Sequence, residues 1–318
     1  MFRIFGPPGT GKTTTLLNYV DQALEAGMSS QDIAFFAFTR KAAGEARERA
    51  ARRFQLNEKA DLPHFRTLHS FAYRALGIRD HDLMKKENFD DLSKKIKIPL
   101  SIRPHYDFEQ ESSSNLLEHP VLGLINLSRL KKTTLRSEYN QTSLDESWPE
   151  VEYIAAAYAE YKQFHGLLDY TDMLELFTKD AERVCPYFKL CFLDEAQDLS
   201  PLQWDIAHAI DKKAERMYCA GDDDQAIYRW AGADVDQFIN LPGGSEVLEQ
   251  SYRIPQAVHR LAESIVSRIH RRFPKKYNPK PQEGSVRRLT SLEELDMSDG
   301  KWLVMAQANY TLSLIAEQ

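Results

Sequence analysis

The chain has 318 residues, of which 42% are hydrophobic and 28% are charged, and its formal net charge is −6. This composition is typical of a soluble globular protein of more than one compact domain, and the acidic balance argues against a protein that coats nucleic acid without selectivity. No apolar run approaches the ~18 residues of a membrane span, and the first residues carry no signal-peptide pattern. We therefore expect a cytoplasmic protein with no membrane partner.

The three cysteines, Cys185, Cys191 and Cys219, are too few and too irregular to predict a disulfide framework. Cys191 and Cys219 stand in apolar, strand-like runs. We interpret these two as buried structural thiols.

The first elements along the chain alternate between strand and helix. Residues 2–5 (FRIF) predict a short strand, and a helix that begins at about Lys12 should end near Gly27. The elements predicted next are a buried strand over 33–38, a helix over 41–54 and a turn-to-helix element over 65–73.

The region 77–166 has a different composition. It is polar, contains many lysines and is interrupted by Pro99, Pro104 and Pro120. We interpret it as a mostly helical inserted subdomain.

Regular alternation returns after the insertion. The elements predicted are a strand over 190–193, a helix over 201–210, a strand over 216–220, a long helix over 255–273, a Pro/Lys-rich linker over 274–284 and strands over 286–289 and 302–306. The pattern indicates an α/β fold whose parallel sheet is flanked by helices, with ligands at the carboxyl ends of the strands. The last two strands would open a second domain.

Residues 6–14 (GPPGTGKTT) match the phosphate-binding loop G-x-x-x-x-G-K-[ST] between a predicted strand and a predicted helix. Glycines let backbone N–H groups surround a phosphate, and the helix adds its positive N-terminal end. The sequence therefore predicts an ATP site with Mg²⁺, with Lys12 on the β- and γ-phosphates and the Thr13 hydroxyl on the metal. The residues predicted to hold the nucleotide are Gly6, Pro7, Pro8, Gly9, Thr10, Gly11, Lys12, Thr13 and Thr14.

The carboxylate that such a site needs follows the strand 190–193. Asp194 is predicted to hold Mg²⁺ through water, and Glu195 to act as the general base for the attacking water. An Asp-Glu pair after a strand often only caps the strand end, but the phosphate loop favours the catalytic interpretation.

Seven sequence blocks resemble, in the same order, those of the UvrD/PcrA/Rep-type superfamily 1 DNA helicases. The blocks are GPPGTGKTT (6–14), AFTRKAAGEA (37–46), TLHSFA (67–72), DYTDML (169–174), FLDEAQDLSPLQ (192–203), GDDDQAIYRWAGAD (221–234) and LEQSYR (248–253). The resemblance implies a RecA-like motor domain over 1–76 and 167–273. It also implies a helical subdomain over 77–166, and a linker with part of a second RecA-like domain over 274–318.

The resemblance also implies roles near the nucleotide. Gln225 should sense the γ-phosphate, Arg253 should stabilise charge during phosphoryl transfer, and Tyr252 should stack on the adenine. Gln197 and Asp198 should link the metal site to neighbouring blocks. Considered alone, a glutamine, an arginine and a tyrosine would more simply be core or surface residues.

For nucleic acid, the resemblance implies aromatic platforms and backbone contacts along a single DNA strand. Alone, His69 is more often a structural histidine and Phe38 a core residue. The positions that match the DNA-contacting ones of the family are Phe38, Thr39, Thr67, His69, Tyr228 and Trp230.

Two stretches of the chain are basic, in contrast to its net charge. Residues 40–53 carry six Lys/Arg against two Glu, and residues 253–288 carry ten against two. They are compatible with surfaces that follow a phosphate backbone, and equally with solvated helix faces.

The function implied is an ATP-dependent DNA helicase or translocase that moves 3′ to 5′ on single-stranded DNA and at duplex/single-strand junctions, with protein partners in repair, replication or defence. Two alternatives stay open: an ATP-gated DNA-binding or regulatory module, and the helicase arm of a recombination or defence nuclease complex. A small-molecule kinase is the residual alternative from the phosphate loop alone.

The sequence departs from the family at three points. A glutamine block upstream of the phosphate loop is absent, the later blocks with a second arginine and a further DNA contact are absent, and Ala231 stands where the family often has arginine. We therefore expect a fragment of a longer helicase that binds ATP but unwinds DNA poorly by itself.

Overall fold

The computed structural model describes residues 1–100, 119–291, 294, 297 and 300–306. Part of the predicted helical insertion and most of the segment 302–318, which resembles the opening of a second domain, lie outside the described residues.

Six parallel strands form one sheet in the order β3-β2-β4-β5-β1-β6. The strands are β1 (Phe2–Phe5), β2 (Ile33–Phe36), β3 (Phe65–Arg66), β4 (Phe188–Leu193), β5 (Ala214–Gly221) and β6 (Ser245–Val247). The predicted α/β fold with a parallel sheet is confirmed. Because the strands run in one direction, all their carboxyl ends meet at one edge of the sheet.

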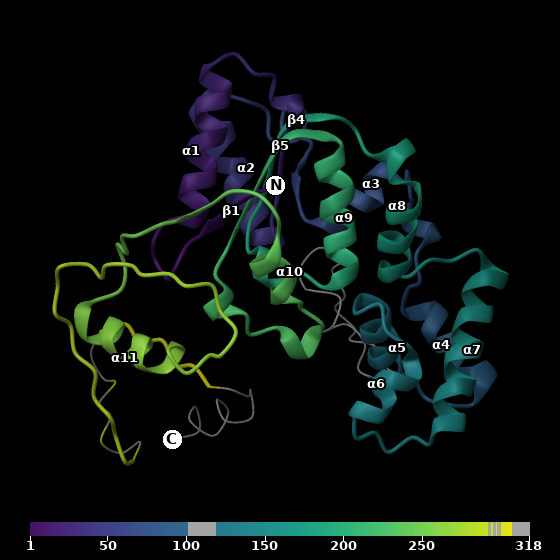
Figure 1. Cartoon of the computed structure of the whole chain (residues 1–318). Coiled ribbons are helices and arrows are strands. Elements are labelled where there is room, and N and C mark those ends of the chain that lie inside the picture. The colour runs from purple at the N-terminus through teal and green to yellow at the C-terminus, as the bar shows by residue number, and fades with distance from the viewer. Residues whose placement is uncertain (101–118, 292–293, 295–296, 298–299, 307–318) are drawn as a thin grey trace.

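Helices cover both faces of the sheet (Figure 1). The helices on the sheet are α1 (Lys12–Glu25), α2 (Arg40–Phe54), α3 (Leu68–Ala75), α8 (Tyr170–Val184), α9 (Pro201–Lys212) and α10 (Val235–Asn240). Ile4 packs with α1 and α2, whereas its neighbour Phe5 packs in the core with α3, α8, α9 and α10. This alternation follows from the two-residue period of a strand with both faces buried.

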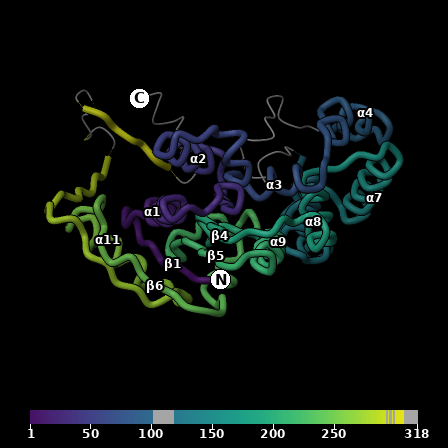
Figure 2. The backbone as a smooth tube through the Cα atoms, turned by 90° about the horizontal axis from the view of Figure 1, so that it is seen from above, coloured from purple at the N-terminus to yellow at the C-terminus, as the bar shows by residue number. Residues whose placement is uncertain are grey.

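Four further helices form a group at one end of the molecule, opposite α11 (Gln256–Val266) (Figure 2). They are α4 (Lys86–Ile96), α5 (Pro120–Leu130), α6 (Leu135–Gln141) and α7 (Trp148–His165). They share a separate hydrophobic core that includes Val121, Val151 and Ile154. Pro120 begins α5 instead of interrupting a helix, because the first helical turn needs no N–H from that residue. The helical character predicted for this region agrees with its described part.

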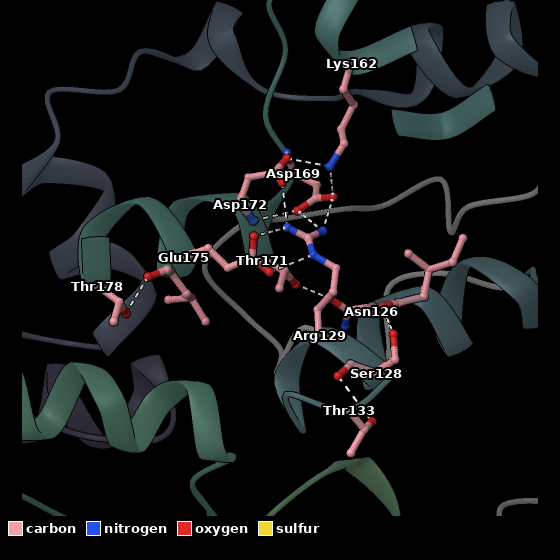
Figure 3. A network of polar contacts seen from close by, with 12 residues as sticks. Asn126, Ser128, Arg129, Thr133, Lys162, Asp169, Thr171, Asp172, Glu175 and Thr178 are labelled. Carbon is pink, nitrogen blue, oxygen red and sulfur yellow. Dashed lines mark hydrogen bonds and ion pairs between the residues drawn. The ribbon is translucent and has the colours of Figure 1, made fainter. Parts of the chain in front are cut away.

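A partly buried polar network ties this helical group to α8 (Figure 3). The Arg129 guanidinium on α5 lies 2.8 Å from Asp169, 2.5 Å from Asp172 and 2.9 Å from Glu175. Lys162 on α7 lies 2.5 Å from Asp169 and 2.6 Å from Asp172. Burial opposes the ionisation of Asp169, but Arg129 and Lys162 outweigh it and lower its pKa to about 2. We call these five residues the Arg129 network.

Three predictions for the C-terminal part need correction. The helix predicted over 255–273 ends at Val266, because the chain beyond it turns back to the sheet, where Arg272 pairs with Asp224. The stretch 274–284, predicted as a linker, packs on the lobe through backbone hydrogen bonds such as Lys280 N–H to Ile254 O (2.9 Å). Residues 286–289 and 302–306 form no strand, and no neighbouring strand pairs with them in the described part of the chain.

Two smaller predictions can be checked directly. All three cysteines are buried and free, as expected for Cys191 and Cys219. Among the described helices, none is both long and apolar enough to cross a membrane.

Candidate active site

The loop between β1 and α1 has a backbone that requires glycine. Gly9 and Gly11 have φ angles of 73° and 85°, in the left-handed region. A Cβ atom at Gly6 would lie 1.9 Å from Lys12 Cγ, and one at Gly9 would lie 2.3 Å from Arg253 Cβ. Since Gly11 has no side chain to cap α1, the first N–H groups of the helix stay open to an anion.

Side chains from this loop meet the end of β4. Lys12 Nζ donates to Gly6 O at 3.0 Å and lies 3.8 Å from Glu195 Oε2. The Thr13 hydroxyl donates to Asp194 Oδ2 at 2.5 Å. Burial and the neighbouring Glu195 raise the pKa of Asp194 to about 6. The loop and the β4 end thus form one polar site.

Glu195 stands in an unusual backbone conformation, with φ 54° and ψ 44°. A residue other than glycine rarely adopts this region, and such strain is often found at functional sites. The conformation turns the chain into a short helix, η4 (Ala196–Asp198), in which Gln197 Nε2 donates to Glu195 Oε2 at 3.0 Å. Burial and Glu195 raise the pKa of Asp198 to about 7, and its Oδ1 has no hydrogen-bond partner in the described structure.

A chain of hydrogen bonds joins Glu195 to Gln225 at the end of β5. Gln197 Oε1 accepts from the Asp222 backbone N–H at 3.0 Å, and Gln225 Nε2 donates to Asp222 Oδ2 at 2.5 Å. A Cβ at Gly221 would lie 2.6 Å from Gln197 Oε1, so this close approach needs a glycine. Gln225 is therefore linked to the carboxylate of Glu195 through two residues, Asp222 and Gln197.

The segment after β6 lies directly on the phosphate loop. The Ser251 hydroxyl donates to Pro8 O at 2.7 Å, and the Tyr252 N–H donates to Gly9 O at 2.9 Å. Tyr252 is 76% exposed, and its ring is free to meet a planar ligand beside the loop. The next residue, Arg253, also lies beside the phosphate loop, and its Cβ is close to Gly9.

The residues present fit a nucleotide with Mg²⁺. Asp194 and Asp198 are buried carboxylates with raised pKa values, which is the expected state of acids whose cation is supplied from outside. No group of three or more His, Cys, Asp or Glu among the described residues would hold a metal alone. Mg²⁺ in nucleotide sites needs only one or two protein carboxylates, because phosphates and water complete its shell.

Three aromatic side chains form a row on the same sheet edge. The rings of Phe38 and Tyr228 have centroids 5.6 Å apart, and those of Tyr228 and Trp230 are 6.4 Å apart. Phe38 packs on the core, whereas Trp230 is 65% exposed. Residues separated by nearly two hundred positions thus present one partly exposed apolar surface.

The polar residues predicted to contact DNA lie at the ends of β2 and β3. Thr39 and Thr67 cap α2 and α3, and their hydroxyls accept N–H bonds from Ala42 and Ser70, each at 3.2 Å. Burial lowers the pKa of His69 to about 4, and its Nε2 has no hydrogen-bond partner in the described structure. Its assignment as a DNA contact stays a prediction, and in this conformation His69 is a neutral group.

Sequence reasoning missed the residues that hold the acidic turn after β5. Lys275 contacts Asp222, Asp223 and Asp224. No local pattern connects a lysine to aspartates some fifty positions earlier. The run of three aspartates was itself the available signal, since adjacent buried acids require a cation nearby.

Comparison with known proteins agrees with this geometry. A family model described as the UvrD/REP helicase N-terminal domain matches residues 2–243. The ATP-dependent DNA helicase PcrA of Leuconostoc citreum is 26% identical over 288 residues, which cover 86% of this chain and 38% of that protein. PcrA of Staphylococcus aureus strain Mu50 is 26% identical over 289 residues, with the same coverage of 86% and 38%. A probable DNA helicase of Mycoplasma pneumoniae is 25% identical over 287 residues, covering 85% of this chain and 53% of that protein.

The chain thus spans well under two thirds of the length of each of these relatives. The family model covers most of the chain, including the phosphate loop, Asp194, Glu195 and Gln225. The chain therefore belongs to the UvrD/REP helicase N-terminal domain family.

Proposed function

We propose that this chain is the ATP-binding motor lobe of a DNA helicase or translocase, which couples ATP hydrolysis to movement on single-stranded DNA. The observation that carries the proposal is the position of the aromatic row. Phe38, Tyr228 and Trp230 lie at the same sheet edge as Lys12 and Glu195, and the turn with Gln225 immediately precedes Tyr228 in the chain. A movement of Gln225 on nucleotide binding would therefore be passed on to the aromatic row through the two residues that separate it from Tyr228.

In this function each side chain has a defined task. Lys12 and the N–H groups of the loop bind the phosphates, and Thr13 with Asp194 holds Mg²⁺, which when bound neutralises charge that develops on the phosphates. Glu195 accepts the proton of the attacking water. Gln225 and Arg253 contact the γ-phosphate, and Tyr252 stacks on the base.

The finer features of the proposal rest on the family. These are 3′ to 5′ movement, preference for duplex/single-strand junctions, a cytoplasmic location and protein partners in repair, replication or defence. The division into a RecA-like lobe (1–76 and 167–273), a helical subdomain (77–166) and a linker with the start of a second lobe (274–318) is part of the same proposal, with the linker residues 274–284 packed on the first lobe.

The test is ATP turnover by the purified chain with and without single-stranded DNA. We expect turnover that single-stranded DNA stimulates, because the side chains proposed to bind the phosphates and Mg²⁺ meet at the same sheet edge as the aromatic row. ATP binding without DNA-stimulated turnover would instead favour an ATP-gated DNA-binding module. No ATP binding would contradict the proposal.

The aromatic row has its own test. Replacing Trp230 with Ala should weaken single-stranded DNA binding by about 1–3 kcal/mol, the contribution of one base stacked on an aromatic ring. ATP affinity should stay near that of the wild type, since Trp230 does not touch the phosphate loop. Unchanged DNA affinity would remove Trp230 from the proposed platform.

A further inference from the structure

Beyond α11 the chain returns to the sheet as a strap, which we define as residues 272–280. The ring of Phe273 stacks on that of Phe5, with centroids 3.9 Å apart and planes at 5°. Phe5 is the last residue of β1 before the phosphate loop. The strap therefore lies against the base of the nucleotide site, although it lies outside the part of the chain that matches the family model.

The strap inserts a lysine into the acidic turn after β5. The Lys275 side chain is 1% exposed, and its ammonium lies 3.2 Å from Asp222 Oδ1, 2.5 Å from Asp223 Oδ1 and 2.8 Å from Asp224 Oδ2. The Arg272 guanidinium donates two hydrogen bonds to Asp224, at 2.9 and 2.6 Å. A buried ammonium and buried carboxylates are each costly alone, so together they fix one another's positions.

The same aspartate connects Lys275 to the proposed catalytic residues. Asp222 Oδ1 contacts Lys275, while its Oδ2 accepts from Gln225 Nε2 at 2.5 Å. The backbone N–H of Asp222 donates to Gln197, which in turn donates to Glu195 Oε2 at 3.0 Å. Lys275 thus lies at the end of a continuous polar chain that leads to Gln225 on one branch and to Glu195 on the other.

The strap has a second attachment, on the segment that covers the phosphate loop. The Ser251 N–H donates to Asn278 O at 2.8 Å, and the Asn278 N–H donates to Glu249 O at 2.6 Å. Ser251 in turn donates to Pro8 O at 2.7 Å. One short segment is therefore bonded both to the turn that carries Gln225 and to the segment that carries Arg253.

We propose that Lys275 is a positioning residue of the nucleotide site, which orients the Gln225 amide through Asp222 and the Glu195 carboxylate through Asp222 and Gln197. The inference rests on the proposed ATP hydrolysis. A purely structural ion pair would affect only folding. A positioning residue affects turnover in molecules that remain folded.

The test compares variants in which the net charge of the acidic turn 222–224 and its partners stays close to that of the wild type, so that the protein still folds. Lys275→Met alone would leave three buried carboxylates, so the main variant is Lys275→Met combined with Asp223→Asn, with Asp223→Asn alone as its reference. Asparagine keeps an oxygen for the Phe273 N–H, which donates to Asp223 Oδ2 at 2.7 Å. Lys275→Arg retains the charge, and Arg260→Met removes an exposed ion pair with Glu283 as a matched control.

Two readouts are measured on the folded protein. Without nucleotide, hydrogen exchange at the Asp222 and Gln225 amides should be about tenfold faster in the double variant than in Asp223→Asn. With ATP and single-stranded DNA, kcat should fall at least about tenfold while the KM for ATP changes less than about threefold. Lys275→Arg should recover part of kcat, and Arg260→Met should match the wild type.

Unchanged exchange, or unchanged kcat in a folded double variant, would overturn the inference. If the wild type itself does not turn over ATP, the proposed function has failed. The exchange measurement then decides alone whether Lys275 orders the Gln225 turn.

Discussion

Two groups of partly or fully buried carboxylates in this molecule differ in where their cations come from. In the Arg129 network, Asp169 is held between Arg129 and Lys162, and its pKa falls to about 2. At the sheet edge, Asp194 and Asp198 are also buried, but their pKa values rise to about 6 and about 7. Among the described residues, Lys12 is the cation that opposes the rise of these two pKa values, and the effect of burial outweighs it.

The difference separates a structural role from a functional one. Carboxylates that the chain neutralises itself hold elements together, as the Arg129 network holds α5 and α7 on α8 (Figure 3). Buried carboxylates without sufficient positive charge beside them lower the stability of the protein when no ligand is bound. They become favourable when a bound cation neutralises them. The acidic turn of Asp222, Asp223 and Asp224 resembles the first group in that the chain itself supplies the cations, Lys275 and Arg272, although burial still raises the pKa of Asp222.

The largest expected effect is on turnover. Glu195→Gln should lower ATP hydrolysis by roughly 10²–10⁴-fold, the contribution of a general base, with ATP binding retained. Glu175→Gln in the Arg129 network is the matched control and should leave turnover per folded molecule unchanged. Steady-state hydrolysis assays measure both, and equal losses in the two variants would contradict the separation of roles.

The next effect is on stability. Arg129→Met leaves three acids without their shared partner and should lower the free energy of unfolding by about 3 kcal/mol, the low end of the range for a broken buried ion pair, because the network is only partly buried. Urea unfolding followed by circular dichroism measures it. Arg183→Met, which removes an exposed pair on the same helix α8, should leave the unfolding curve in place. A destabilisation no larger than that of Arg183→Met would mean that the network is not structural.

A third effect depends on pH. Because the folded pKa of Asp169 is lowered, its contribution to stability is fully present above about pH 4 and is lost as the pH falls towards about 2. Asp169→Asn should therefore be less stable than the wild type by about 2 kcal/mol at pH 6, with the difference shrinking over this acidic window. Unfolding curves at several pH values measure the difference. A constant difference would show that charge is not the cause.

The smallest effect has the opposite sign. The folded pKa of Asp198 is raised to about 7, so without nucleotide the wild type should lose stability as the pH rises from about 4 to about 7. Asp198→Asn should lack this loss, which we expect to be about 1–2 kcal/mol because water screens an open site. Parallel pH series of the two proteins provide the measurement. If the wild type instead gained stability relative to Asp198→Asn between about pH 4 and about pH 7, the pKa of Asp198 would be lowered by folding and not raised.

Much of this architecture is predictable because its signals are local. A glycine-rich loop between an apolar run and a helix identifies β1 and α1, and apolar runs identify β2, β4 and β5. The edge strands β3 and β6 have two and three residues, too few for a period to be visible. The helix predicted over 255–273 exists as α11, but its predicted C-terminal end is wrong, because Arg272 and Phe273 bind partners far away in the sequence.

The same distinction applies to the site. The roles of Lys12, Thr13 and Asp194 can be predicted from the sequence, because each belongs to a short motif in which the residue type indicates the chemistry. The link from Gln225 to Glu195 depends on the register of β4 beside β5, which places Leu193 opposite Cys219. The burial of His69 Nε2 depends on packing that no motif records, whereas the capping roles of Thr39 and Thr67 are local, since each hydroxyl accepts from an N–H three residues later.

The most direct test of the central claim is calorimetric titration of the chain with ATP, with and without Mg²⁺. If Asp194 is a carboxylate that awaits a cation, Mg²⁺ should tighten ATP binding to the wild type at least about tenfold, and Asp194→Asn should lose most of that gain. Equal ATP affinity with and without Mg²⁺ in the wild type, or an undiminished gain in Asp194→Asn, would contradict it.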